Sequence, residues 1–143
     1  MNKISKKPFA KTFICHCHID RDAVYDLYSR LKKDGIDVWL DVENLQPGEH
    51  WQNEIRKAIL KSDIVIVCLS QKFNEQQGYR HEELKIALEK AKLLDDQVFI
   101  IPVRLEACDM PECLSHLHRV DLFKAGGYKK LVHALQRFEN LDS

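Results

Sequence analysis

The stretch at residues 63–70, which reads DIVIVCLS, constrains the fold of this chain most. Its six consecutive apolar residues, flanked by Asp63 and Ser70, are typical of a β-strand that is buried on both faces. Such strands occur in parallel sheets, because the helices that connect parallel strands cover both faces of the sheet. The stretch therefore predicts a parallel sheet with a layer of helices on each side.

Helical and extended patterns alternate along the rest of the chain. Apolar residues at i, i+3, i+4 and i+7 predict helices, and short β-branched runs predict strands. We expect strands at residues 11–16, 36–40, 63–70, 97–105 and 119–123, and helices at 20–33, 51–61, 79–94 and after Gly126-Gly127. This order predicts an α/β fold, a flavodoxin-like three-layer sandwich with a parallel sheet of about five strands. We expect a flexible N-terminal lead at residues 1–10, the domain at 11–138, and a tail or the start of a linker at 139–143.

Composition argues against several classes of protein. The chain has 22 Lys and Arg against 22 Asp and Glu, so it lacks the basic excess that nucleic-acid binding needs. It contains neither an apolar run of membrane-spanning length nor a secretory signal at its start, so we expect no membrane contact. Its five cysteines, an odd number, favour free thiols and a reducing cytoplasm.

Known nucleotide and hydrolase motifs are also missing from the sequence. The five glycines never fall in dinucleotide-binding or P-loop spacing, and no Ser stands in G-x-S-x-G. The third expected strand ends in Cys68-Leu69-Ser70, whereas a phosphoacceptor receiver domain needs an Asp at this position. We therefore look for a site of another kind.

Ligands of open parallel sheets bind beyond the carboxyl ends of the strands. Two segments that follow expected strands contain clustered Cys and His. In Cys15-His16-Cys17-His18, neighbouring side chains of an extended chain point to opposite faces. The second cluster matches no common zinc spacing; it comprises Cys108, Cys113, His116 and His118. We favour no metal at either place, with metal binding as the open alternative.

Glu83 is the most informative polar residue in the sequence. Gly78 breaks the chain just before the helix expected at residues 79–94, so Glu83 lies near the start of that helix, where the helix dipole favours an ionised carboxylate. It directly precedes the core-facing Leu84, which places it at the border between the buried and the solvated face. An ordinary acidic residue at a helix N-terminus would occupy the same position, so both interpretations stay open here.

Four motifs, in this order, resemble the TIR (Toll/interleukin-1 receptor) domain of bacterial type. Residues 13–20 (FICHCHID) are similar to the first box of that family. Trp39-Leu40-Asp41, followed by Leu45-x-Pro47-Gly48-x-x-Trp51, resembles its BB loop. Ala58-Ile59, Ser62-Asp63 and Cys68-Leu69-Ser70 resemble its third strand and the approach to it, and Tyr79-x3-Glu83-Leu84 resembles its aromatic-x3-Glu motif. The resemblance covers nearly the whole chain.

The resemblance implies an enzyme that cleaves NAD+ between nicotinamide and ribose, with NAD+ as the substrate and no cofactor. The catalytic residue of the family is the Glu of the aromatic-x3-Glu motif, which corresponds to Glu83 here. Tyr79 stands where Trp is usual, and Cys15 and Cys17 stand where small Ser residues are common. The substrate-binding residues that the resemblance implies are Cys15, His16, His18, Asp41, Trp51, Ser70 and Tyr79. For Trp51, packing in the core on the Ile55 stripe is an equal alternative.

The resemblance also implies self-assembly, because in many TIR enzymes the BB loop of a neighbouring copy completes the site. In this chain the BB loop comprises Val42, Glu43, Asn44, Leu45, Gln46, Pro47 and Gly48. We therefore expect other TIR domains as partners, activation in a homo-oligomer or filament, a fused or associated sensor module, and a role in bacterial antiphage or immune signalling. Two alternatives stay open: a non-catalytic adaptor for TIR–TIR contacts, and a cyclase in which adenine rather than water captures the ribosyl cation.

Overall fold

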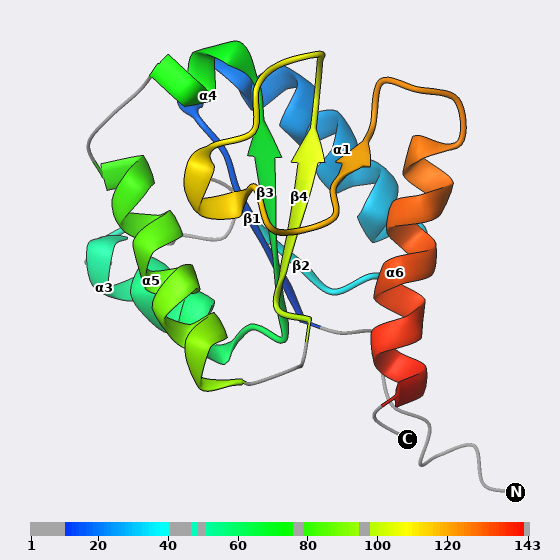
Figure 1. The fold of residues 1–143 in the computed structure, drawn as a ribbon. Coiled ribbons are helices and arrows are strands. Elements are labelled where there is room, and N and C mark those ends of the chain that lie inside the picture. Colours follow the sequence, from blue (N-terminus) through cyan, green and yellow to red (C-terminus); the bar gives the residue numbers. More distant parts are fainter. Residues whose placement is uncertain (1–10, 41–46, 49–50, 76–78, 95–97, 142–143) are drawn as a thin grey trace, which may run out of the picture.

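Five parallel strands form one sheet in the order β2-β1-β3-β4-β5. The computed structural model describes residues 11–40, 47–48, 51–75, 79–94 and 98–141. Its strands are β1 (Thr12–Cys15), β2 (Val38–Leu40), β3 (Ile64–Leu69), β4 (Ile100–Arg104) and β5 (Val120–Asp121). Its helices are α1 (Arg21–Lys33), α3 (Trp51–Lys61), α4 (Gln71–Glu75), α5 (Tyr79–Leu93) and α6 (Gly127–Leu141), with 3-10 turns η2 (His18–Asp20) and η3 (Glu112–Leu114). The predicted flavodoxin-like α/β sandwich is confirmed (Figure 1).

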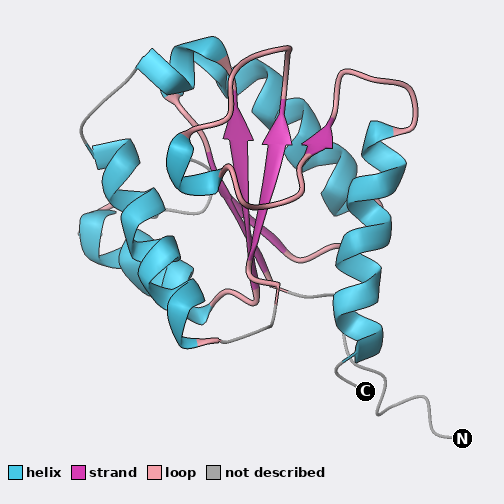
Figure 2. Ribbon diagram, in the orientation of Figure 1, coloured by secondary structure: helices cyan, strands magenta, loops and turns pink. Residues whose placement is uncertain are grey.

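β3 is the central strand, and its burial explains the layers. All six of its residues are buried, and it pairs with β1 on one side and with β4 on the other. Its even-numbered residues belong to the core on the side of α1 and α6, and its odd-numbered residues to the core on the side of α3 and α5. Figure 2 shows these helices on the two faces of the sheet. Each fully buried aliphatic side chain contributes about 1.5–3 kcal/mol to folding, so the strand depends on both layers.

Gly35 ends α1 as its position in the sequence suggests. It has a φ of 88°, a left-handed conformation that glycine adopts without a steric penalty. The Gly35 N–H donates to the Lys32 carbonyl, and the Ile36 N–H donates to the Leu31 carbonyl, both at 3.0 Å. These two bonds form a Schellman motif, which turns the chain from α1 into the approach to β2.

Pro102 lies inside β4 without breaking the sheet. On the β3 side of β4, Val65 N–H donates to Phe99 and Leu105 N–H donates to Leu69. Residues alternate in direction along a strand, so the Pro102 nitrogen points to the other side, toward β5. β5 begins at Val120, which pairs with Val103. The missing N–H of Pro102 therefore faces a side that the described strand β5 does not reach.

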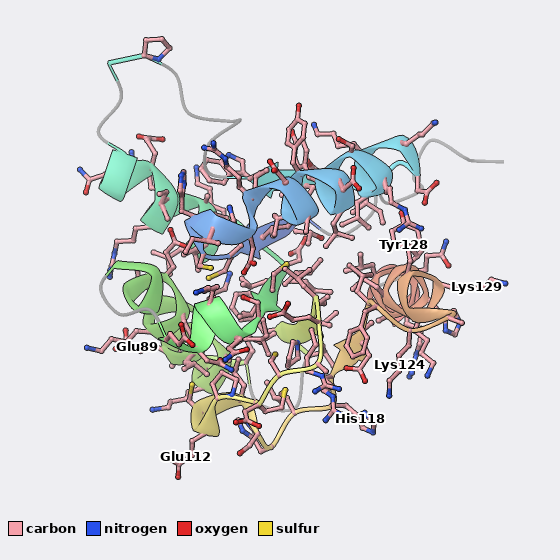
Figure 3. The ribbon with its side chains drawn as sticks, turned by 90° about the horizontal axis from the view of Figure 1, so that it is seen from above. Glu89, Glu112, His118, Lys124, Tyr128 and Lys129 are labelled. Carbon is pink, nitrogen blue, oxygen red and sulfur yellow. The ribbon has the colours of Figure 1, made fainter. Side chains whose placement is uncertain are left out.

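α6 contacts α1 on the face of the sheet that both helices cover. The Tyr128 hydroxyl donates to Asp34 Oδ2 at 2.5 Å, and the Arg30 guanidinium lies 3.8 Å from the centre of the Tyr128 ring. Burial and the hydrogen bond to Asp34 raise the pKa of Tyr128, so it stays neutral and keeps donating at physiological pH. Tyr128 is labelled in Figure 3 on the side of α6 that faces α1.

An ion cluster secures β5, which has only two residues. Arg104 donates from Nε and Nη2 to the two carboxylate oxygens of Asp121 at 2.7 and 3.0 Å. Arg119 Nε donates to Asp121 at 3.0 Å, and Lys124 Nζ lies 3.5 Å from it. These cations lower the pKa of Asp121, with the Arg104 hydrogen bond as the largest cause. A strand of two residues forms few backbone hydrogen bonds with its neighbour β4. The ion pairs of Asp121 therefore help to hold β5 against β4.

The structure also contains the helix α4, which the sequence analysis did not predict. Five residues carry too weak an apolar period to be recognised, although Phe73 is fully buried. The Ser70 hydroxyl accepts the Phe73 N–H at 3.0 Å, which caps this helix. None of the helices in the described segments combines the length and hydropathy that a membrane span requires.

We predict that Gly127→Ala destabilises the protein more than Gly126→Ala. A Cβ on Gly127 would lie 2.2 Å from the Asp121 carbonyl oxygen, so the β5–α6 connection must shift, at about 1–3 kcal/mol. Gly126 has open space around it and a φ of 80°, so only the backbone penalty of about 1–2 kcal/mol applies. Urea unfolding measures both variants, and equal free energies of unfolding would contradict the packing at Gly127.

We also predict that Asp121→Asn removes part of the acid sensitivity of the fold. A carboxylate whose pKa is lowered by folding contributes stability above its unfolded pKa of about 3.9, and that stability is lost as the pH falls below this value. The difference in Tm between wild type and Asp121→Asn is therefore constant above about pH 5 and shrinks below about pH 4. Asp26→Asn, which removes a carboxylate at an exposed position of α1, is the control and should leave the Tm at pH 7 close to that of wild type. A difference that grows on acidification would contradict the prediction.

Candidate active site

The carboxyl ends of the strands meet at one edge of the sheet, which Figure 3 shows from above. Cys15 ends β1 and pairs in register with Val67 of β3, so Ser70 follows just beyond the neighbouring strand end. Further along the same edge, the labelled His118 and Lys124 lie near β5 and α6 (Figure 3). Parallel pairing therefore collects the residues that follow β1 and β3, as the sequence analysis predicted.

The side chains at the end of β1 and just after it do not alternate strictly between the core and solvent. Cys15, His16 and Cys17 are all buried, at 1% exposure or less, whereas His18 is exposed in η2. Cys15 and Cys17 belong to the core on the side of α3 and α5. Of the histidines that the sequence proposed as substrate ligands, His18 therefore faces solvent, and His16 is enclosed by protein.

Asp20 joins the end of β1 to the end of β3. Its Oδ2 atom accepts a hydrogen bond from the Ser70 hydroxyl, which lies fifty residues further along the chain, and another from the Cys17 thiol at 3.1 Å. The Ser70 hydroxyl in turn accepts the Phe73 N–H. The sequence analysis named Ser70 but overlooked Asp20 as a site residue. An Asp just before a helix reads as a cap, and only the fold brings it to Ser70.

Two buried thiols near this edge, Cys17 and Cys68, have raised pKa values. Burial and the hydrogen bond to Asp20 raise the pKa of Cys17. Burial, and next the charge of Asp20, raise the pKa of Cys68. Thiolates are the form that attacks substrates and binds metals, so these cysteines serve as neutral core residues. Within the described part of the chain, no group of three or more His, Cys, Asp or Glu is arranged to hold a metal ion.

Glu83 lies deeper than the sequence analysis suggested. The pattern placed it at the border of the buried face, but its side chain is only 3% exposed. The reason is that Ala87, one turn later on α5, is fully buried, so Glu83 shares the stripe that faces the sheet. Its neighbours Leu84 and Ala87 belong to the same core as Cys15 and Cys17. An ordinary acidic residue at a helix start is exposed to solvent, so burial separates Glu83 from that class.

Several predicted residues are described only in part or not at all. Asp41, predicted as a substrate-binding residue, and residues 42–46, most of the BB loop, lie outside the described residues. Pro47 and Gly48 form a turn with Gly48 at a φ of 90°, a conformation that a Pro-Gly pair favours. Trp51 and Tyr79 begin α3 and α5, but their side chains are not among those described.

The described residues line two hollows, of which the smaller borders α4 and α5. The larger, of about 410 Å³, lies at the amino edge between β2 and α3, where Trp39 stacks on Phe13 with ring centres 5.2 Å apart. Its lining includes three lysines and the two carboxylates of Asp37 and Glu54, and the hydroxyl of its buried Ser62 donates to the Ala58 carbonyl. The smaller, of about 260 Å³, lies between α4, the start of α5 and the loop after β4. We place the candidate site at the carboxyl edge, because the Asp20 contacts lie there and the neighbours of Glu83 pack in the same core as Cys15 and Cys17.

Comparison with known proteins identifies the family. The family model described as TIR domain matches residues 12–136. The chain belongs to the TIR domain family. Its fold agrees with the TIR domain of the Toll-related receptor TRR-2 from Hydra magnipapillata, with a TM-score of 0.74, 23% identity and coverage of 89% of this chain and 98% of that one.

Two relatives show how this TIR domain compares in sequence. Protein y4cD of Sinorhizobium fredii (strain NBRC 101917 / NGR234) is 33% identical over 121 residues, which cover 83% of this chain and 19% of that protein. The NAD(+) hydrolase TcpA of Theionarchaea archaeon (strain DG-70-1) is 34% identical over 92 residues, which cover 64% of this chain and 27% of that protein. This chain therefore spans only about a fifth to a quarter of the length of these relatives.

Proposed function

We propose that this TIR domain cleaves NAD+ at the bond between nicotinamide and ribose, with Glu83 as the catalytic carboxylate. The observation that carries the proposal is the burial of Glu83 on α5, next to Leu84, which belongs to the same core as the end of β1. A carboxylate is costly to bury and is retained mainly where it has a chemical use. The relative named NAD(+) hydrolase TcpA supports the choice of substrate.

The chemistry needs only one carboxylate. In NAD+ the nicotinamide nitrogen carries a positive charge, and when the C–N bond breaks its electron pair returns to that nitrogen. Nicotinamide therefore leaves as a neutral molecule, and no general acid has to protonate it, in contrast to the paired carboxylates of ordinary glycosidases. The ribosyl group becomes an oxocarbenium-like cation. Water then adds to its C1′ atom and releases a proton, which gives ADP-ribose.

The Glu83 carboxylate would stabilise the positive charge that develops on the ribose. Electrostatic stabilisation is strongest where water is excluded, because the effective dielectric constant there is low. With 3% of its surface exposed, Glu83 meets this condition. If the adenine ring captures C1′ in place of water, the same carboxylate serves a cyclase, so the two reactions differ only in the nucleophile.

The remaining substrate contacts follow from the positions of the predicted residues. His18 is exposed beside the end of β1 and can contact a phosphate or a ribose hydroxyl of the substrate. Cys15 and His16 are buried and would form the wall of the site behind it. Asp41, Trp51 and Tyr79 complete the proposed set. We further propose that a neighbouring copy supplies its BB loop, so that assembly activates the enzyme. A sensor elsewhere in a longer protein would drive this assembly in an immune response.

The second candidate function is a non-catalytic adaptor. Ile19 in η2 and Tyr25 on α1 are large apolar residues with 58% and 48% exposure. Such residues are favourable in contacts between proteins. In this function the domain binds other TIR domains and leaves NAD+ intact, so a test of catalysis separates the two functions.

We predict that Glu83→Gln abolishes nicotinamide release, whereas Glu89→Gln preserves it. Both residues lie on α5, but Glu89 is exposed and is labelled on the outer side of the molecule in Figure 3. Loss of one charge-stabilising group costs about 100-fold to 1,000-fold in rate. The assay measures nicotinamide by chromatography, with each protein at the same density on beads and its fold checked by circular dichroism. Equal activity of wild type and Glu83→Gln would exclude Glu83, and no activity in the folded wild type would favour the adaptor.

A further inference from the structure

Asp20 occupies a capping position but does not cap its helix. It is the residue just before α1, where an Asp side chain commonly accepts an N–H from the first turn of the helix. Here the side chain makes no such bond. Its Oδ2 atom instead accepts from the Ser70 hydroxyl and the Cys17 thiol. The chain thus forgoes a local stabilising contact in favour of a distant one, and such exceptions to local rules concentrate at functional sites.

The contact reaches three elements of the candidate site. Cys17 precedes the turn η2 and Asp20 ends it, His18 lies between them, and the Asp20 N–H also donates to the Cys17 carbonyl at 3.0 Å. Ser70 follows β3, and its hydroxyl caps α4 through the Phe73 N–H. One carboxylate oxygen therefore fixes the turn after β1 to the end of β3 and to the start of α4.

We propose that Asp20 is a positioning residue of this site, which acts through Ser70 and Cys17 to hold the turn of His16 and His18 in its binding geometry. The inference rests on the proposed cleavage of NAD+. Asp20 does not act on the reacting atoms, and the substrate-binding role first assigned to Ser70 becomes a role in this support. Because the supported turn binds substrate and Glu83 lies on a different element, the loss of Asp20 weakens binding more than it slows the chemical step.

The kinetic test compares Asp20→Ala, Ser70→Ala and the double variant, with Ser70→Thr to restore a hydroxyl and Asp26→Ala as an exposed control on α1. A displaced binding turn costs about tenfold to 100-fold in efficiency. We expect this loss as a higher KM for NAD+, with kcat within about threefold of wild type. The double variant should be no worse than the worse single variant, because both remove one network. Asp26→Ala should behave as wild type, whereas Ser70→Thr, which keeps the hydroxyl but adds a methyl group at a buried position, should lose less than Ser70→Ala. A lower kcat with unchanged KM would overturn the proposal, since it indicates loss of folded protein or of catalysis.

A second measurement follows the turn without relying on activity. The rate of alkylation by N-ethylmaleimide is measured at each cysteine by peptide mass spectrometry. Cys113 is exposed and reports that the reagent is active, whereas Cys68 is fully buried in β3 and reports on the whole fold. Ser70→Ala, which leaves the Asp20 carboxylate beside the thiol, should raise the rate at Cys17 at least about tenfold and leave Cys68 protected. Equal gains at Cys17 and Cys68 would show general unfolding and overturn the proposal.

The two measurements separate failure of the inference from failure of the proposed function. A clustered wild-type protein that leaves NAD+ intact overturns the proposed function and the positioning role with it, even where Cys17 labelling shows that the Asp20 contact exists. A wild-type protein that cleaves NAD+, together with variants whose KM is unchanged, overturns the positioning role alone.

Discussion

The two-sided burial of β3 is the constraint on which the rest of this structure depends. A strand with six buried residues needs a layer of helices on each face. Helices can cover both faces only if each connection crosses the sheet, and such crossovers make neighbouring strands parallel. Parallel strands end at the same edge. The hydrophobicity of one short segment therefore determines where polar residues from distant parts of the chain meet.

At the carboxyl edge, hydrogen bonds and ion pairs of carboxylates stabilise the fold. The same protein also buries the carboxylate of Glu83, and the burial of a carboxylate costs free energy of folding. Asp20 satisfies the hydroxyl of Ser70 and the thiol of Cys17, and Arg104 neutralises Asp121 beside β5. The buried Glu83 carboxylate opposes folding unless its charge is compensated. In the proposed enzyme, the positive charge that develops on the ribose provides part of this compensation during the reaction. The carboxylate is then most useful at the moment when the substrate carries that charge.

Local rules in the sequence were sufficient for the main elements of the fold. The apolar run of β3, the helical period of α1 and the stop at Gly35 each act over a few residues, so pattern alone predicted them. α4 was missed because its five residues show no clear period, and its cap from Ser70 becomes visible only in three dimensions. Glu83 was identified, but its depth was underestimated because burial depends on what the helix packs against. The Asp20–Ser70 contact joins residues fifty positions apart and has no local signature.

We propose that this TIR domain is an NAD+-cleaving enzyme that works on assembly. This activity is tested most directly by a time course of NAD+, nicotinamide and the nucleotide product, measured by mass spectrometry, with the same amount of wild-type protein dense on beads and dilute in solution. The account predicts that one nicotinamide appears for each NAD+ lost, faster on the beads, with ADP-ribose or its cyclic form as the partner product. Intact NAD+ in both formats, with a folded protein, would contradict it.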